Sequence, residues 1–148
     1  MAAVVAYETM WGGTEAMARA IVEGLTAGGV SAKMRRLSSS DRTDVISEML
    51  EARGVIVGSP NLNNGVSPQV DELLSEIKGL KFVGHVAAAF GCFGWGGGAT
   101  KVVEDSLRKA RTEIPLPALQ VKWHPDAEDL ERCFDFGKHL AEKLKSKS

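Results

Sequence analysis

Short, continuously apolar runs alternate along this chain with longer segments whose apolar residues recur every three or four positions. The clearest short runs cover residues 54–58, with Val55-Ile56-Val57 at the centre, and residues 83–90. A strand that is apolar on both faces must be covered on both faces, which is the situation of strands in a parallel sheet. Alternating strands and helices produce such sheets, because each parallel return needs a crossover. The pattern therefore predicts an α/β fold.

Five strands are expected to alternate with five helices. The apolar runs that suit strands cover residues 2–7, 30–37, 54–58, 83–90 and 119–123. Helical spacing of apolar residues predicts the core face of each helix. The first helix has Met17, Ala20, Ile21 and Leu25, and the second is short and covers residues 44–50. The third has Val70, Leu73, Leu74 and Ile77, the fourth has Val102, Val103 and Leu107, and the fifth, over residues 126–145, has Leu130, Phe134, Leu140 and Leu144. We therefore expect one doubly wound domain over residues 1–148, with helices on both faces of a parallel sheet of order 2-1-3-4-5.

Composition and charge exclude several classes of protein. The 18 basic and 19 acidic residues leave a formal net charge of -1. A nucleic-acid-binding protein normally carries a basic excess, so nucleic acid is not an expected partner. We find no signal peptide and no run long enough to span a membrane. Cys92 and Cys133 lie far apart without metal-type spacing, so a reducing cytoplasm is the expected setting.

Three unusual loops follow the first, third and fourth expected strands. Ligands of doubly wound sheets bind beyond the carboxyl ends of the strands, where the strand order reverses. In a 2-1-3-4-5 sheet, these three loops lie at that edge. They also concentrate the glycine, asparagine, hydroxyl and aromatic residues of the chain. We therefore expect the functional site to be formed by these three loops together.

The first loop has the chemistry of a phosphate-binding turn. It reads Thr9-Met10-Trp11-Gly12-Gly13-Thr14, with hydroxyls flanking two glycines at the start of a helix. Free backbone N–H groups and the helix dipole favour a phosphate there. The alternative is a plain capped helix, with Gly13 or Thr14 near the cap. A P-loop is excluded because no lysine follows the glycines, and the glycine spacing excludes a dinucleotide loop.

The second loop reads Ser59-Pro60-Asn61-Leu62-Asn63-Asn64-Gly65. It predicts a tight bend, because Asn and Gly tolerate positive φ. Asn63 and Asn64 offer donors and acceptors to the edge of a heterocycle, and Leu62 is suited to cover one face of a flat ring. The alternative is a surface turn without a ligand.

The third loop reads Gly91-Cys92-Phe93-Gly94-Trp95-Gly96-Gly97-Gly98 and sets two large aromatics among five glycines. Aromatic side chains in such a setting are costly to expose, and a stacked ring is a natural cover. The alternative is that Phe93 and Trp95 cap the core. Cys92 is interpreted as a small filler, with a redox-active thiol as the alternative.

Taken in order, the three loops resemble those of the flavodoxin family. The resemblance rests on Glu8-Thr9-Met10-Trp11-Gly12-Gly13-Thr14-Glu15, Gly58-Ser59-Pro60-Asn61-Leu62-Asn63-Asn64-Gly65 and Phe90-Gly91-Cys92-Phe93-Gly94-Trp95-Gly96-Gly97-Gly98, and it extends over essentially the whole chain. More narrowly, the chain is similar to the flavodoxin domain of flavodiiron proteins, also called A-type flavoproteins. It departs from that narrower family because a diiron domain is absent from this sequence.

The resemblance implies a flavodoxin-like fold that binds FMN. It implies that the phosphate is held by Thr9, Met10, Trp11, Gly12, Gly13 and Thr14. It places Ser59, Pro60, Asn61, Leu62, Asn63, Asn64 and Gly65 along the isoalloxazine, and it gives backbone contacts and a stacking aromatic to Gly91, Cys92, Phe93, Gly94, Trp95, Gly96 and Gly97. Trp95 is the expected stacked ring. No metal ligand is implied within the chain.

The resemblance also implies redox proteins as partners. Rubredoxin or ferredoxin is the expected electron donor and a diiron protein or domain the expected acceptor, and a homodimer is a further expectation. An FMN electron carrier is the leading function, with an FMN-dependent reductase of a small quinone or nitro substrate as the alternative. A response-regulator receiver is disfavoured, because the third strand ends in Gly58-Ser59-Pro60 without an aspartate.

Overall fold

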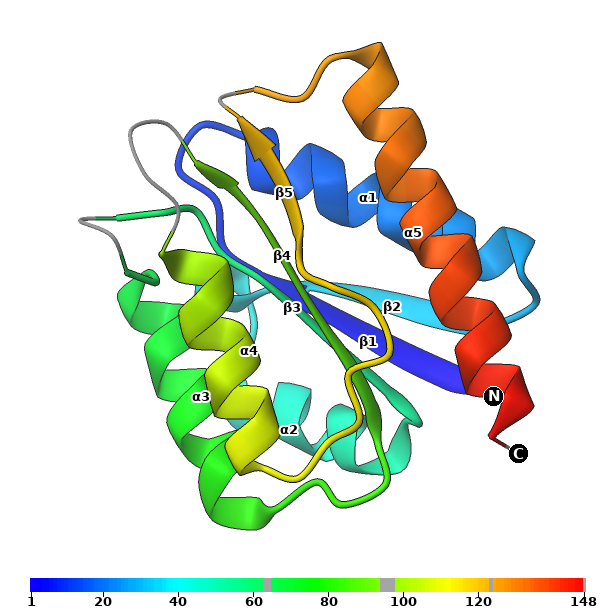
Figure 1. The fold of residues 1–148 in the computed structure, drawn as a ribbon. Coiled ribbons are helices and arrows are strands. Elements are labelled where there is room, and N and C mark those ends of the chain that lie inside the picture. Colours follow the sequence, from blue (N-terminus) through cyan, green and yellow to red (C-terminus); the bar gives the residue numbers. More distant parts are fainter. Residues whose placement is uncertain (63–64, 94–97, 123, 148) are drawn as a thin grey trace.

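A computed structural model describes residues 1–62, 65–93, 98–122 and 124–147 of the chain. In that part, five strands form one parallel sheet: β1 (Ala2–Tyr7), β2 (Ser31–Arg36), β3 (Gly54–Gly58), β4 (Val86–Phe93) and β5 (Leu119–Lys122). The strand order is β2-β1-β3-β4-β5 (Figure 1), which confirms the doubly wound α/β fold predicted from the sequence.

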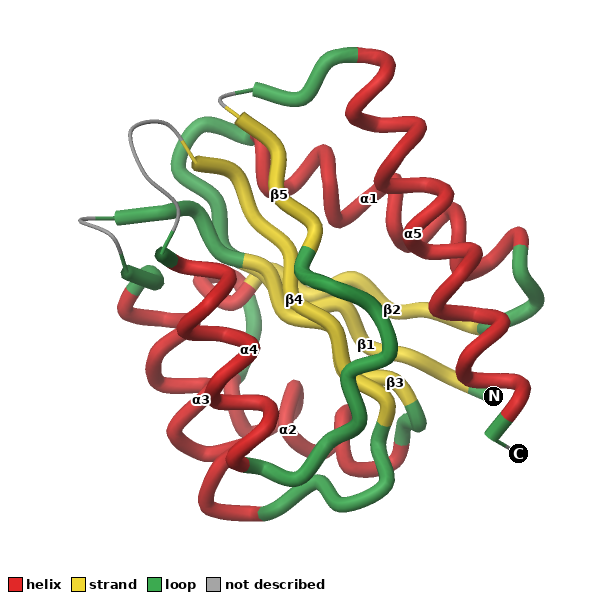
Figure 2. The backbone as a smooth tube through the Cα atoms, in the orientation of Figure 1, coloured by secondary structure: helices red, strands yellow, loops and turns green. Residues whose placement is uncertain are grey.

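Helices cover both faces of this sheet. They are α1 (Gly13–Ala27), α2 (Arg42–Glu51), α3 (Pro68–Leu80), α4 (Ala99–Lys109) and α5 (Ala127–Ser146), and a 3-10 turn, Leu37–Ser39, follows β2. α1 and α5 lie on one face, and α2, α3 and α4 lie on the other (Figure 2). Among the described helices, none combines the length and the apolar character needed to cross a membrane.

Successive strand residues point to opposite faces of the sheet, and both faces are buried. Ala3, Val5 and Tyr7 of β1 pack in the core beneath α1 and α5, whereas Val4 and Ala6 pack beneath the other three helices. All five residues of β3 are buried. The inner strands β1 and β3 are therefore continuously apolar rather than alternating, which is the feature that predicted a parallel sheet.

The fourth strand lies further along the chain than its apolar run predicts. The prediction covers residues 83–90, whereas β4 covers Val86–Phe93. Val83 is 64% exposed in the turn before the strand, where Gly84 adopts a φ of 84°. At the other end, Gly91, Cys92 and Phe93 pair with β5. Part of the predicted third loop is therefore strand, and the loop leaves the sheet at Phe93.

Two predicted core faces of helices also need correction. In α4, Val102 is exposed instead of buried. In α5, Leu130 and Phe134 are only half-buried, and Phe136 is buried in their place. Residues 134 and 136 lie about 200° apart around a helix, so both rings cannot face the sheet. Helical spacing alone did not identify which of the two rings does so.

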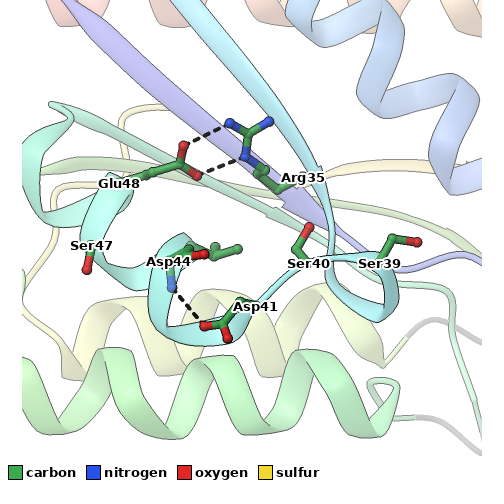
Figure 3. Close-up of a pocket in the computed structure, with 8 residues that line it drawn as sticks. Arg35, Ser39, Ser40, Asp41, Asp44, Ser47 and Glu48 are labelled. Carbon is green, nitrogen blue, oxygen red and sulfur yellow. Dashed lines mark hydrogen bonds and ion pairs between the residues drawn. The ribbon is translucent and has the colours of Figure 1, made fainter.

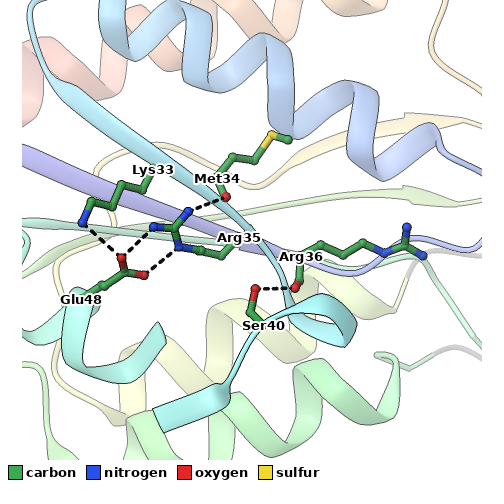
Figure 4. A network of polar contacts seen from close by, with 6 residues as sticks. All are labelled: Lys33, Met34, Arg35, Arg36, Ser40 and Glu48. Carbon is green, nitrogen blue, oxygen red and sulfur yellow. Dashed lines mark hydrogen bonds and ion pairs between the residues drawn. The ribbon is translucent and has the colours of Figure 1, made fainter. Parts of the chain in front are cut away.

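Charged side chains form a network at one edge of the sheet, the edge formed by β2 (Figure 4). Glu48 of α2 accepts hydrogen bonds from Nε and Nη2 of Arg35, each 2.8 Å long, and from Nζ of Lys33 at 3.1 Å. The hydrogen bonds from Arg35 lower the pKa of Glu48 to about 2, against the opposing effect of burial. Such charges also discourage the edge strand from pairing with another chain.

Glu48→Gln is expected to lower the free energy of unfolding by about 1 kcal/mol at neutral pH, because the pair is partly exposed and screened by solvent. The pKa of Glu48 is depressed in the folded state, so this stabilisation is full above the unfolded value of about 4.3 and is lost as the pH falls towards 2. Urea unfolding of both proteins at neutral and strongly acidic pH measures it. A difference that persists at acidic pH contradicts the assignment, and Glu51→Gln on the same helix is the control.

Candidate functional site

Three connections leave the sheet at the same edge and lead into α1, α3 and α4 (Figure 1). They follow β1, β3 and β4, which are the strands singled out in the sequence. The structure describes residues 8–12 of the first connection, residues 59–62 and 65–67 of the second, and residue 98 of the third, which follows Phe93 at the end of β4. The predicted site residues are therefore gathered at one edge, as far as they are described.

The first loop ends in a left-handed glycine that opens α1. Gly12 has a φ of 88°, and its N–H donates to the Oγ1 of Thr9 at 2.9 Å. Within the part of the chain that the structure describes, no side chain caps the start of this helix, and a Cβ built on Gly12 meets no heavy atom within 4 Å. The start of α1 therefore lacks a side-chain cap among the described residues, which is the situation in which helix N-termini can bind anions.

The remaining residues of the first loop separate into buried and exposed groups. Gly13 and Thr14 are buried, and the Thr14 hydroxyl lies against the thiol of Cys92. Burial raises the pKa of that thiol, so it stays protonated at neutral pH. Met10 and Trp11 are 53% and 82% exposed. The indole of Trp11 is therefore the large apolar group that this loop presents to solvent.

Glu8 lies buried directly behind the first loop, and the sequence-based interpretation gives it no role. Its Oε2 accepts hydrogen bonds from the N–H of Thr9 and from Nε of Arg36, both 3.0 Å long, and its Oε1 accepts from the N–H of Ser38 at 2.8 Å. Burial alone would raise the pKa of Glu8, but these hydrogen bonds outweigh it and hold the pKa below its ordinary value. Glu8 thus ties the start of the first loop to the end of β2.

Glu8→Gln is expected to lower the free energy of unfolding by about 1.5–3 kcal/mol at neutral pH. Either orientation of the new amide sets an NH2 group against at least one N–H donor, so the loss exceeds that of a single bond. Because the folded pKa is depressed, the stabilisation by Glu8 is present above the unfolded pKa and is lost as the pH falls through the folded pKa.

Chemical denaturation of the wild type, Glu8→Gln and the exposed control Glu23→Gln tests this expectation. The control should leave the unfolding free energy unchanged. A Glu8→Gln protein as stable as the wild type at neutral pH would show that the buried carboxylate is not an anchor.

The second loop is held closed by its own hydrogen bonds. The hydroxyl of Ser59 donates to the carbonyl of Pro60 at 2.8 Å and accepts from the N–H of Ser67 at 3.1 Å. Leu62 and Gly65 exchange two backbone hydrogen bonds of 2.8 Å, in agreement with the predicted tight bend. Ser59 and Pro60 are buried, and Leu62 is half-buried. Asn63 and Asn64 lie outside the described residues.

The third loop begins in close contact with the second. A Cβ on Gly91 would lie 2.3 Å from the carbonyl oxygen of Ser59, so only glycine fits there. A small cleft separates the two loops and is lined by Ser59, Asn61, Gly91, Cys92, Phe93, Ala99, Thr100 and Gln120. The remaining predicted residues of this loop, Gly94, Trp95, Gly96 and Gly97, lie outside the described residues. The assignment of Trp95 as the stacked ring therefore stays a prediction.

A larger hollow of about 610 Å³ lies between β2 and α2, away from the three loops (Figure 3). It is lined by Arg35, Ser39, Ser40, Asp41, Asp44, Val45, Ser47 and Glu48. The guanidinium of Arg35 is held by Glu48, and Asp41 accepts the N–H of Asp44 as the cap of α2. With Val45 as the one apolar side chain in this lining, the hollow offers little surface for a flat apolar ring.

Comparison with known sequences places the chain in a family. The family model for flavodoxin matches residues 5–137. A nitric oxide reductase of Moorella thermoacetica is 49% identical over 143 residues, which are 96% of this chain and 36% of the relative. An anaerobic nitric oxide reductase flavorubredoxin of Pectobacterium atrosepticum is 39% identical over 137 residues, which are 91% of this chain and 27% of the relative. The chain thus spans roughly a third of the length of these relatives.

Solved structures give the same result. The rubredoxin oxygen:oxidoreductase of Desulfovibrio gigas superposes with a TM-score of 0.95 at 36% identity, over 99% of this chain and 36% of that chain. A flavodoxin from the domain Archaea superposes with a TM-score of 0.89 at 28% identity, over 98% of this chain and 99% of that chain. The fold is therefore found both as part of longer proteins and as a protein of this length.

Proposed function

The chain belongs to the flavodoxin family, whose cofactor is FMN, and from this premise we infer that one FMN binds non-covalently across the loops after β1, β3 and β4. The phosphate would lie at the N-terminus of α1, and the ring would lie at the second and third loops. The observation that carries this proposal is the start of α1 behind Gly12, where no side chain of the described residues caps the helix and a Cβ on Gly12 would meet no heavy atom within 4 Å.

The first loop fits a phosphate without a counter-charge of its own. It contains no Lys or Arg, and the nearby Arg36 is hydrogen-bonded to Glu8. The backbone N–H groups at the start of α1 and the helix dipole would therefore supply the favourable field. The hydroxyl of Thr9 already fixes Gly12, so the loop is organised before the ligand binds.

Apolar side chains at the same edge fit a flat ring. Leu62 and Phe93 are half-buried, and Trp11 is largely exposed. Together with the exposed Met10 beside it, Trp11 offers apolar surface that a ligand or partner could cover. Trp95 remains the stacking aromatic that we propose from the family resemblance, and Trp11 and Phe93 are the candidates among the described residues.

The function proposed from this arrangement is electron transfer. FMN, when bound, takes up and gives off electrons one or two at a time. The three loops would hold and orient the cofactor, and the exposed Met10 and Trp11 leave the edge open to a second protein. Small and transient contacts of that kind are typical of electron-transfer partners.

We further propose that the chain relays electrons between a small carrier, such as rubredoxin or ferredoxin, and a diiron protein or domain. Similar proteins carry the names nitric oxide reductase, flavorubredoxin and rubredoxin oxygen:oxidoreductase. Within the described residues, no group of three or more His, Cys, Asp or Glu comes together that could hold a metal ion. The relay proposal therefore assigns metal-dependent reduction to residues other than those described here.

The relay proposal predicts no catalytic reduction of nitric oxide by the isolated chain. The flavin-loaded protein is fully reduced under anaerobic conditions, nitric oxide is added, and nitrous oxide is measured by gas chromatography. Rapid, catalytic formation of nitrous oxide by metal-free protein would refute the relay. Steady turnover of a quinone with NADH alone would instead favour a small-substrate reductase.

A further inference from the structure

Asn61 connects the second loop to both ends of the third loop. Its backbone N–H donates to the carbonyl of Cys92, close to the end of β4, at 3.1 Å. Its side-chain Oδ1 accepts hydrogen bonds from the N–H groups of Gly98 and Ala99, each 3.1 Å long. Asn61 is thus hydrogen-bonded both to β4, which precedes the third loop, and to the start of α4, which follows it.

This arrangement caps α4 from a distance. Helices are usually capped by a Ser, Thr, Asp or Asn next to their first residue. The N-cap of α4 is Gly98, which has no side chain to offer, and Asn61 supplies the missing acceptor from 37 positions upstream. A cap from a neighbouring residue would satisfy the N–H groups of the helix equally well, but it would not connect the helix to the second loop. The cap from Asn61 therefore also fixes the distance between the second loop and the start of α4.

Asn61 also lines the cleft between the two loops, together with Ala99 and Phe93. In the proposed function, the ring of FMN lies at these two loops, and the phosphate lies at the first loop. We propose that Asn61 is a positioning residue that fixes the second loop against the end of β4 and the start of α4, and thereby sets the affinity for the flavin ring. This inference rests on the proposed function.

The inference predicts how each of two substitutions of Asn61 changes the binding of FMN and of riboflavin. Asn61→Leu keeps a similar shape but removes the acceptor. FMN and riboflavin should both bind roughly tenfold more weakly, because the two hydrogen bonds that hold the start of α4 against the second loop are lost. Asn61→Asp keeps an acceptor at the helix N-terminus and should bind both ligands within about threefold of the wild type, because Asn and Asp cap helices equally well.

Thr112→Val provides the matched control. The hydroxyl of Thr112 donates to the carbonyl of Leu107 at 2.8 Å, at the opposite end of α4. Its loss should leave both dissociation constants unchanged. Quenching of flavin fluorescence measures all affinities, and circular dichroism establishes that each variant is folded.

The outcomes decide between this inference and the proposed function. A parallel weakening of FMN and riboflavin in Asn61→Leu, restored in Asn61→Asp, supports the inference. An unchanged Asn61→Leu protein overturns it, as does a loss confined to FMN, which would assign Asn61 to the phosphate. If Asn61→Leu does not fold, a tenfold loss in Asn61→Asp still overturns it. A wild type that binds neither ligand overturns the proposed function instead.

Discussion

Replacing Gly137 with alanine is expected to lower the free energy of unfolding by about 2–3 kcal/mol, because α1 and α5 touch through their backbones at this position. A Cβ on Gly137 would lie 2.3 Å from the carbonyl oxygen of Ile21 and 2.9 Å from the backbone nitrogen of Leu25. No flexible side chain can yield there, so the helices must separate. The better helix propensity of alanine, worth about 1 kcal/mol, offsets only part of this cost.

Gly79→Ala is the matched control for Gly137→Ala. Gly79 also lies within a helix, α3, but a Cβ there meets nothing within 4 Å. This substitution should be neutral or should stabilise the fold by up to about 1 kcal/mol. Urea unfolding of the flavin-free proteins measures both effects without stabilisation by the ligand. Equal effects of the two substitutions would contradict the close backbone contact.

Gly12→Ala is expected to weaken FMN binding roughly tenfold, or about 1.4 kcal/mol. Gly12 has a φ of 88°, a conformation that costs other residues about 1–2 kcal/mol. The alanine variant can relieve this strain by moving the first loop, and ligand binding must then restore the strained conformation. The strain therefore reappears as lost affinity.

Gly29→Ala separates backbone strain from the proposed phosphate site. Gly29 lies beyond the other end of α1 and has a φ of 89°, almost the same as Gly12. Its substitution should reduce the stability of the fold and leave the dissociation constant of FMN unchanged. Fluorescence titrations of both variants make the comparison. An equal loss of affinity in both variants would indicate a general effect of instability and not a site at Gly12.

The sequence predicted the sheet well because burial on both faces leaves a continuous apolar run. Gly54–Gly58 is such a run, and its predicted and observed bounds agree. The prediction for β4 was displaced because Val83 is apolar but exposed in a turn. Composition does not distinguish a valine in a turn from a valine in a buried strand. In α5, similarly, composition does not distinguish the half-buried Phe134 from the buried Phe136.

The sequence was enough to predict which segments form the loops of the candidate site, but not the hydrogen bonds that connect these loops to the rest of the fold. Glycine, asparagine and hydroxyl residues identified them by their local chemistry. Apart from the adjacent Thr9, the side-chain partners of Glu8 and Asn61 lie 28 to 38 positions away in the sequence, and tertiary structure alone brings them together. A carboxylate directly after the apolar run of β1 was the one signal that could have drawn attention to Glu8.

Titration of the 15N-labelled, flavin-free protein with FMN tests the central claim most directly. Amide resonances should saturate at one FMN per chain, with the largest shifts at residues 9–14, 61–65 and 92–99. Riboflavin should reproduce the shifts of the last two groups but not those at the start of α1, because it lacks the phosphate. Largest shifts around the hollow between Arg35 and Glu48, or equal shifts of the first loop with both ligands, would contradict the proposed site.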